Sequence, residues 1–362
     1  MSKKKISTTL TVLLLSGSIL VVSAMIVPRF VNTTVAKSIP EVQKTGKQIL
    51  TSSKAPLLKV EAEKVKTTLS DVNKELQQLM TQEELQQIYD FVDKRDNEIT
   101  ESRQMTEDEV NRRLILQDQY LYDGLRPKKP LALKPGQAEY YWDLDKNRIH
   151  YPNRPLTDEE LLETTDWYYR MDYAMSKRNI VTPLDSKDLS KTDAVALAST
   201  SVSKLFGADV SNMEVYANLD DILLSNKKTW MITFAPYKAD TLRAQGKEFW
   251  QYTVIIDYLT RTVVDTTATN FTLKRTPINT EAAHAIQNDA TWIHEATKIV
   301  TDKQGESRKI TQAYLINTDK NNSRGMVEIK LLLEDGSSYI AELRYPDQTL
   351  RCLIYEEAEV AK

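Results

Sequence analysis

The sequence has three histidines, His150, His284 and His294, which are the first candidates for metal chemistry. His294-Glu295 begins like the zinc motif H-E-x-x-H, in which a second histidine four residues later faces the same metal. Lys298 occupies that position, so the second ligand is missing. His284 and His294 point in different directions around a helix of about 3.6 residues per turn. The histidines therefore do not predict a zinc site.

Two polar runs begin with the alternating oxygen ligands of a calcium loop. The first run opens with Asp143, Asp145 and Asn147. Arg148 then stands where the loop needs glycine, and Arg154 stands where it needs a bidentate glutamate. This run therefore does not predict a calcium site.

The second run contains Asn317, Asp319 and Asn321, and Glu328 follows at the twelfth position. Asn322 at the glycine position can adopt the left-handed conformation. The run lacks the first carboxylate, because Asn317 stands there. A polar hairpin loop is the interpretation that this run favours over calcium binding.

The remaining reactive side chains are neighbouring acids and one cysteine. Asp220-Asp221 and Glu356-Glu357 are adjacent in sequence, so on a strand they point to opposite faces. A glycosidase needs two carboxylates about 5 to 10 Å apart across a cleft. Cys352 is the single cysteine, which rules out an intramolecular disulfide, and its apolar neighbours predict a core or edge residue of a strand. The sequence thus predicts no catalytic residue, no cofactor and no metal ligand.

Composition excludes several classes of protein. The 362-residue chain has a net charge of −3, whereas nucleic-acid binders usually carry a basic excess. It has only 9 glycines, and the nearest pair, Gly325 and Gly336, lies too far apart for a glycine-rich phosphate loop or a G-x-S-x-G elbow. We therefore expect no nucleic-acid, nucleotide or esterase function.

The chain begins with an uncharged apolar run over residues 6–28, directly after Lys3, Lys4 and Lys5. Roughly 20 apolar residues cross a membrane as a helix, and flanking lysines stay in the cytoplasm. We therefore expect a cytoplasmic tail over residues 1–5, a single-pass anchor over 6–28 and an extracytoplasmic body. A cleaved signal peptide is the alternative, since the 10–22 core precedes a small-residue site. The protein would then be secreted.

Residues 29–123 are predicted to be a helical region. Between residues 58 and 79, apolar residues recur at alternating spacings of four and three, which is a heptad seam. The seam predicts either packing within the monomer, which we favour, or a coiled-coil stalk that forms a homodimer. Thr81 with Glu84, and Thr106 with Glu109, have the spacing of capping boxes that begin helices.

A boundary rich in proline and lysine follows at residues 124–136 and reads as a solvated linker. Beyond it, strand-like residues 138–142 and 148–151 predict a hairpin, and a helix is expected to run from about Thr157 to Arg178. Four aromatic residues of this helix extend past one face. They predict either a possible interaction surface or packing against the neighbouring domain: Trp167, Tyr168, Tyr169 and Tyr173.

The rest of the chain repeats one pattern. Each of two blocks, about 80 residues long, has one amphipathic helix followed by three or four alternating strands. We expect an internal structural repeat and two α+β domains with antiparallel sheets. The first, over residues 137–275, includes the hairpin and the aromatic helix, and the second spans 276–362.

The first block resembles the PepSY and cystatin-like group of extracytoplasmic bacterial domains. Trp-Met-Ile-Thr-Phe at residues 230–234 is similar to their central strand, and residues 252–264 are similar to their closing hairpin. Arg261 replaces the glycine that the family often has in that hairpin. Residues 151–178 look like the joint between two such units. The resemblance implies binding or inhibition, as in anchored regulators of surface proteases or sensor kinases.

These observations favour a membrane-anchored, extracytoplasmic protein-interaction module that regulates or inhibits an envelope protease or sensor kinase. Its expected partners are the membrane, through residues 6–28, and another envelope protein. The alternatives are a scaffold of the cell envelope tethered by a coiled coil, and a hydrolase of wall polymers.

Overall fold

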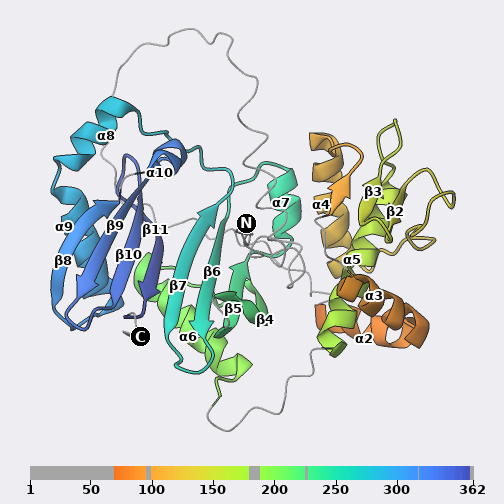
Figure 1. The fold of residues 1–362 in the computed structure, drawn as a ribbon, viewed down its shortest axis with the longest axis horizontal. Coiled ribbons are helices and arrows are strands. Elements are labelled where there is room, and N and C mark those ends of the chain that lie inside the picture. The colour runs from red at the N-terminus through yellow and green to blue at the C-terminus, as the bar shows by residue number, and fades with distance from the viewer. Residues whose placement is uncertain (1–68, 95–98, 179–187, 225–226, 317, 359–362) are drawn as a thin grey trace, which may run out of the picture. The chain divides into compact units, whose positions relative to one another are not determined.

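The computed structural model describes residues 69–94, 99–178, 188–224, 227–316 and 318–358 (Figure 1). The apolar run at 6–28, the start of the heptad seam and Asn317 lie outside these ranges. No helix in the described ranges is both long and apolar enough to span a bilayer. The described chain is a mixture of helices and mainly antiparallel strands, and it divides into two compact units.

The helical unit comprises the described residues up to Arg103 together with 119–176. Its long helix is α5, Asp158–Arg178. The other elements are α2 (Leu69–Leu79), α3 (Gln82–Lys94), the end of α4 (Glu107–Tyr122), and the short strands β1 (Thr100–Glu101), β2 (Tyr141–Asp143) and β3 (Arg148–His150). β2 and β3 form the predicted antiparallel hairpin, and β1 adds to β3 in parallel.

Capping boxes begin α3, α4 and α5. At α3, the Thr81 N–H donates to Glu84 Oε2 at 2.8 Å, and the Glu84 N–H donates to Thr81 Oγ1 at 3.2 Å. The same reciprocal bonds link Thr106 with Glu109 and Thr157 with Glu160. Each box satisfies backbone donors that a helix end leaves free. The two boxes predicted from spacing are thus confirmed.

The described end of the heptad seam lies in α2. Val72 is fully buried and Leu76 is 1% exposed, whereas Leu79 is 54% exposed. Two of these seam residues therefore pack inside the monomer. The earlier part of the seam lies outside the described residues, so the homodimer stays a prediction.

The sheet unit comprises residues 104–118 and the described residues from 177 onward. Its eight strands form one antiparallel sheet in the order β4-β5-β6-β7-β11-β10-β9-β8 (Figure 1). The first four strands are β4 (Glu214–Leu224), β5 (Lys227–Ala235), β6 (Trp250–Asp257) and β7 (Val263–Asn270). The last four are β8 (Ile310–Ile316), β9 (Met326–Leu333), β10 (Ser338–Arg344) and β11 (Leu350–Glu356).

Helices cover one face of this sheet. α6 (Lys191–Phe206) packs Ala198 and Val202 on the first four strands, in a core that includes Ile232 and Val254. On the last four strands lie α8 (Thr280–Gln287), α9 (Thr291–Lys298) and its π-helical continuation η3 (Ile299–Gln304). Two short helices, α7 (Ala239–Ala244) and α10 (Asp319–Arg324), connect strands. We call the face opposite α6 and α9 the open face.

Each half of the sheet has a helical segment followed by four strands, which confirms the predicted repeat of a helix with three or four strands. The single helix expected in the second block is instead divided into α8 and α9. The two halves meet through their last strands, because β7 and β11 pair antiparallel with Thr267 opposite Cys352. Two open edges thereby become one ladder, which satisfies backbone groups that each half would leave exposed. The blocks expected as two domains, 137–275 and 276–362, thus share one sheet. The hairpin and α5, expected in the first of them, belong to the helical unit.

Candidate functional site

The seam between β7 and β11 brings polar side chains together on the open face. The Thr267 hydroxyl donates to Asp265 Oδ1 at 2.7 Å and contacts Cys352 Sγ at 3.0 Å. Burial raises the pKa of the Asp265 carboxyl and of the Cys352 thiol. A thiol with a raised pKa stays protonated and is a poor nucleophile. Cys352, only 4% exposed, is therefore a core residue of a strand, as predicted.

Next to Cys352, on β10, Glu342 is a buried carboxylate held by two arginines. Arg324 Nη2 lies 2.7 Å from Glu342 Oε1, and Arg351 pairs with the other oxygen. The Glu342 side chain is 6% exposed, whereas those of Arg324 and Arg351 are 26% and 22% exposed. The buried carboxylate thus orients two guanidinium groups that remain accessible to solvent.

A close backbone approach brings a third arginine to the same place. Gly325, directly after Arg324, has a φ of +65°, and a Cβ there would lie 2.3 Å from the Thr276 carbonyl oxygen. The Ile278 N–H also donates to the Asn322 carbonyl at 2.9 Å. The segment after β7 is therefore fixed against the end of α10. Its exposed Arg275 lies close enough to Arg324 and Arg351 for their charges to affect its pKa.

A fourth arginine, Arg344, ends β10. Its guanidinium carbon lies 4.7 Å from the centre of the Trp250 ring, and its Nη2 donates to the Ala268 carbonyl at 3.4 Å. A guanidinium over an indole ring is held by a cation–π interaction. We call Arg275, Arg324, Arg344 and Arg351 the arginine cluster.

The charges of the arginine cluster are only partly compensated. Neither Arg275 nor Arg344 forms an ion pair within the described residues. Partial desolvation lowers the pKa of both guanidinium groups, although the Arg275 side chain stays exposed, and the neighbouring Arg351 lowers both pKa values further. The nearby acids are Glu342, Glu328 opposite it on β9, Asp347 and Asp265, and burial favours the neutral form of Asp265. Guanidinium groups remain charged in proteins, so this site attracts anions and is unsuited to proton transfer.

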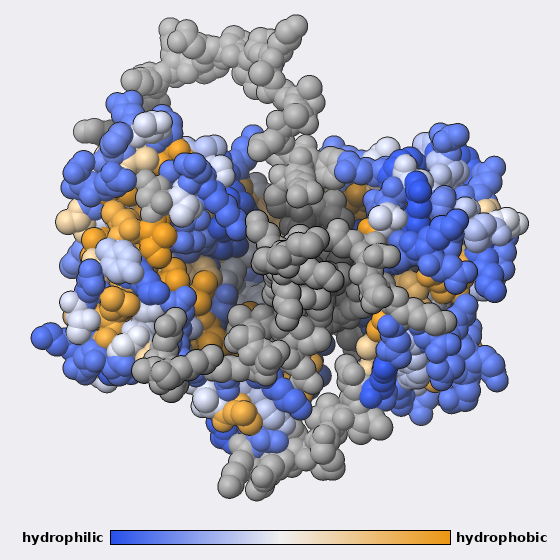
Figure 2. All heavy atoms as spheres, in the orientation of Figure 1, coloured by the Kyte–Doolittle hydropathy of each residue, from blue (hydrophilic) through white to orange (hydrophobic). Residues whose placement is uncertain are grey.

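An apolar row lies beside the arginine cluster on the open face. Tyr314, Ile340 and Ile354 share one line across the sheet, with Lys330 between the first two. Ile340 and Ile354 are partly exposed, and Tyr314 on the edge strand is 38% exposed. In Figure 1 α6 lies behind the strands, and Figure 2 shows hydrophobic residues gathered over β8, β9 and β10. The row and the cluster together combine apolar surface with positive charge.

The four aromatic residues predicted as a possible interaction surface lie in the helical unit. Trp167, Tyr169 and Tyr173 are each 6% exposed or less, and only Tyr168 is partly exposed. The buried Trp142 contacts Trp167 and Tyr168 edge to face, at 6.5 and 5.8 Å between ring centres. Three of the four residues therefore form part of the interior of their own unit. Their ring contacts inside the helical unit are of the packing kind.

The basic linker at 124–136 contains no helix or strand, as predicted, but two of its charges contact acids of the helical unit. Arg126 Nε donates to Glu75 Oε1 at 3.0 Å. Lys129 Nζ lies 3.6 Å from the buried Glu163. Part of the linker's charge is therefore structural rather than solely solvated.

The three histidines and the two polar runs lie on different elements of the described structure. His150 stacks on Tyr141, with ring centres 4.5 Å apart, and His284 and His294 lie on different helices. Asp319 and Asn321 form α10 between β8 and β9. Nowhere in the ranges that the structure describes do three or more His, Cys, Asp or Glu side chains converge as metal ligands.

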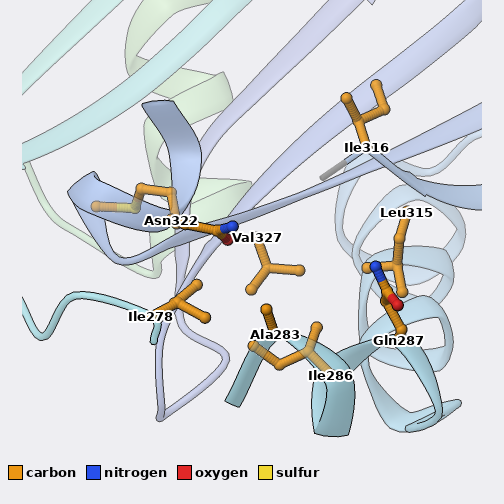
Figure 3. Close-up of a pocket in the computed structure, with 9 residues that line it drawn as sticks. Ile278, Ala283, Ile286, Gln287, Leu315, Ile316, Asn322 and Val327 are labelled. Atoms are coloured by element: carbon orange, nitrogen blue, oxygen red, sulfur yellow. The ribbon is translucent and has the colours of Figure 1, made fainter. Parts of the chain in front are cut away.

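A small hollow lies between α8, α10 and β9 (Figure 3). Its volume is about 20 Å³, which accommodates about one water molecule. The lining is mainly apolar and includes Ile278, Ile286, Leu315 and Val327. The hollow is thus too small for an organic ligand.

Sequence reasoning missed the arginine cluster, because its members come from four separate segments. The linker after β7, the end of α10, the end of β10 and the start of β11 each supply one residue. The one local signal is Gly325 directly after Arg324, which marks a tight turn. No family model matches the chain, and no match is found among curated proteins or solved structures.

Proposed function

We propose that this chain is a membrane-anchored, extracytoplasmic protein-interaction module. The observation that carries the proposal is the arginine cluster beside the partly exposed Tyr314, Ile340 and Ile354 on the open face. Protein interfaces are enriched in arginine and aromatic residues around an apolar centre, with a polar rim. A strand edge at Tyr314 adds backbone groups that a partner can pair with.

The compartment in this proposal comes from the uncharged run at 6–28 and the lysines before it. The resemblance to PepSY and cystatin-like domains supports a binding or inhibitory role. We accordingly infer that the partner is an envelope protein, and that a surface protease or a sensor kinase is the class to test first.

Photo-crosslinking in native membranes tests this function. A photoreactive amino acid replaces Tyr314 in the full chain, and the control replaces Leu259, which is 73% exposed in the turn between β6 and β7. We expect the Tyr314 position to capture one discrete protein and the Leu259 position to capture none. Equal labelling at both positions, or none at Tyr314, would contradict an interaction through the open face.

A further inference from the structure

The arrangement of the arginine cluster around Glu342 indicates the chemistry of its ligand. Arg324 and Arg351 each bind a different oxygen of Glu342. Guanidinium groups match the planar, two-oxygen shape of a carboxylate. The protein's own residue thus shows that this part of the sheet is shaped to receive a carboxylate.

The guanidinium groups of Arg275 and Arg344 are not paired with Glu342 and can receive a second carboxylate. Arg344 is held in place by the Trp250 ring and the Ala268 carbonyl, so little side-chain freedom is left to lose on binding. Arg275 directly precedes Thr276, whose backbone is fixed by its close contact with Gly325. Neither group forms an ion pair among the described residues. Both guanidinium groups therefore keep donors available for a carboxylate, and that of Arg344 is also held in position.

The surroundings distinguish between kinds of anion. Ile340 on β10 lies opposite Ile354 on the neighbouring strand β11. Ile340 is two residues before Glu342, so the two side chains share one face of the sheet. A ligand that reaches the arginine cluster across the open face thus passes over apolar side chains. Phosphate or a sugar acid has no apolar group to place there, whereas a peptide that carries both acidic and apolar residues does.

We infer that the arginine cluster binds side-chain carboxylates of an acidic, partly apolar peptide segment of the partner protein. Arg275 and Arg344 donate to the incoming carboxylate, and Arg324 and Arg351 stay on Glu342. This inference rests on the proposed function and adds the chemistry of the partner to it.

The test uses the full chain in nanodiscs of phosphatidylcholine, titrated calorimetrically with a capped Glu-Leu-Glu-Leu-Glu peptide. The matched peptide Gln-Leu-Gln-Leu-Gln has the same apolar residues without the charge. We expect the glutamate peptide to bind at least tenfold more tightly, with an affinity that falls as salt is added. Equal binding of the two peptides, or no binding of either, contradicts the inference.

Substitutions locate the binding. Arg275→Gln and Arg344→Gln should each weaken the glutamate peptide about tenfold, because each removes a charge-assisted hydrogen bond. Arg148→Gln, on an exposed residue of the helical unit, is the control and should leave the affinity unchanged. Arg275 is exposed, so its variant is expected to fold even if the Arg344 variant does not. Unchanged affinity in the folded Arg275 variant would overturn the assignment.

Two further titrations separate the anion classes. Inorganic phosphate and vesicles containing phosphatidylglycerol replace the peptide, and we expect both to bind more weakly than the glutamate peptide. Tighter binding of either would mean a phosphate or lipid site. The crosslink from Tyr314 separates the two proposals. If it persists in Arg344→Gln while no acidic peptide binds, the interaction function stands and the carboxylate inference falls.

Discussion

Three ion pairs of the helical unit and the arginine cluster of the sheet unit use charged residues differently. In the helical unit, arginines are paired with acids inside the unit: Arg126 with Glu75, Arg154 with Glu160, and Arg170 with Asp166. In the sheet unit, Arg308 is likewise paired with Glu306 and Asp335. The arginine cluster differs, because it places four guanidinium groups around one directly paired carboxylate, Glu342. The difference teaches that charge density alone does not mark a binding site; the site is where charges are oriented but not compensated.

The largest expected effect breaks the interior of the helical unit. Trp142 is 1% exposed and contacts Phe91, Trp167 and Tyr168 through its ring. Trp142→Ala should lower the free energy of unfolding by about 4 kcal/mol, because it removes these contacts and leaves a cavity. Denaturant unfolding followed by near-ultraviolet circular dichroism measures the loss. Trp142→Phe, which keeps a ring, should lose clearly less.

The next prediction tests whether the paired charges of the helical unit are structural. The 5% exposed Asp166 lies 2.6 Å from Arg170 Nε and accepts a hydrogen bond from the Tyr120 hydroxyl at 2.8 Å. Asp166→Ala should cost about 3 kcal/mol of unfolding free energy, since it leaves the mostly buried Arg170 with only the longer contact to Glu84, at 3.5 Å. The control is Asp108→Ala, whose partly exposed pair with Arg112 should contribute less than about 1 kcal/mol. Equal losses would remove the contrast between the two pairs.

The third prediction removes the negative charge at the centre of the arginine cluster, through Glu342→Gln. Loss of the central carboxylate should lower the free energy of unfolding by about 2 kcal/mol, because two guanidinium groups lose their partner. Added glutamate salt should restore stability in this variant more than in the wild type, in thermal melts at constant ionic strength. If sodium chloride restores it equally, the effect is screening rather than binding.

The smallest change expected between two neighbouring measurements concerns the pH dependence of stability, through the buried carboxyl group of Asp118 in the sheet unit. Asp118 is buried, accepts a hydrogen bond from the Thr241 N–H at 2.7 Å, and faces Asp240, Lys238 and Arg243. Burial, and then the nearby Asp240, raise the pKa of Asp118 to about 7. The folded chain therefore keeps a proton here that the unfolded chain releases near pH 4.

Stability should accordingly fall as the pH rises from about 4, the unfolded pKa, through about 7, the folded pKa, and then level off. The slope that Asp118 contributes is at most about 1.4 kcal/mol per pH unit, the value for one proton. Asp118→Asn keeps an acceptor for Thr241 and removes the titration, so the difference between wild type and variant isolates the slope. Urea unfolding at half-unit pH steps measures it, and parallel curves for the two proteins would contradict the assignment.

Local rules predicted local structure well. The spacing of Thr81 and Glu84 predicted a helix start because both partners of a capping box lie within one turn. Glu334-Asp335-Gly336-Ser337 likewise has the residues typical of a tight hairpin turn, and it connects β9 and β10, where Gly336 has a φ of +85°. The aromatic residues of α5 were less well predicted, since amphipathicity cannot show that elements on several sides bury a helix.

The amino-acid sequence by itself determined most of the long helices and strands, their order and the repeat of a helix with three or four strands, because propensity, caps and turns act over a few residues. It did not predict the short elements β1, α7 and α10 or the division between α8 and α9. Only the tertiary structure decided that the two repeats share one sheet, and that Arg275, Arg324, Arg344 and Arg351 meet there. The physical reason is that strand edges and surface charges are satisfied by partners far along the chain. Which partner each one takes depends on packing of the whole sheet, and no local pattern encodes it.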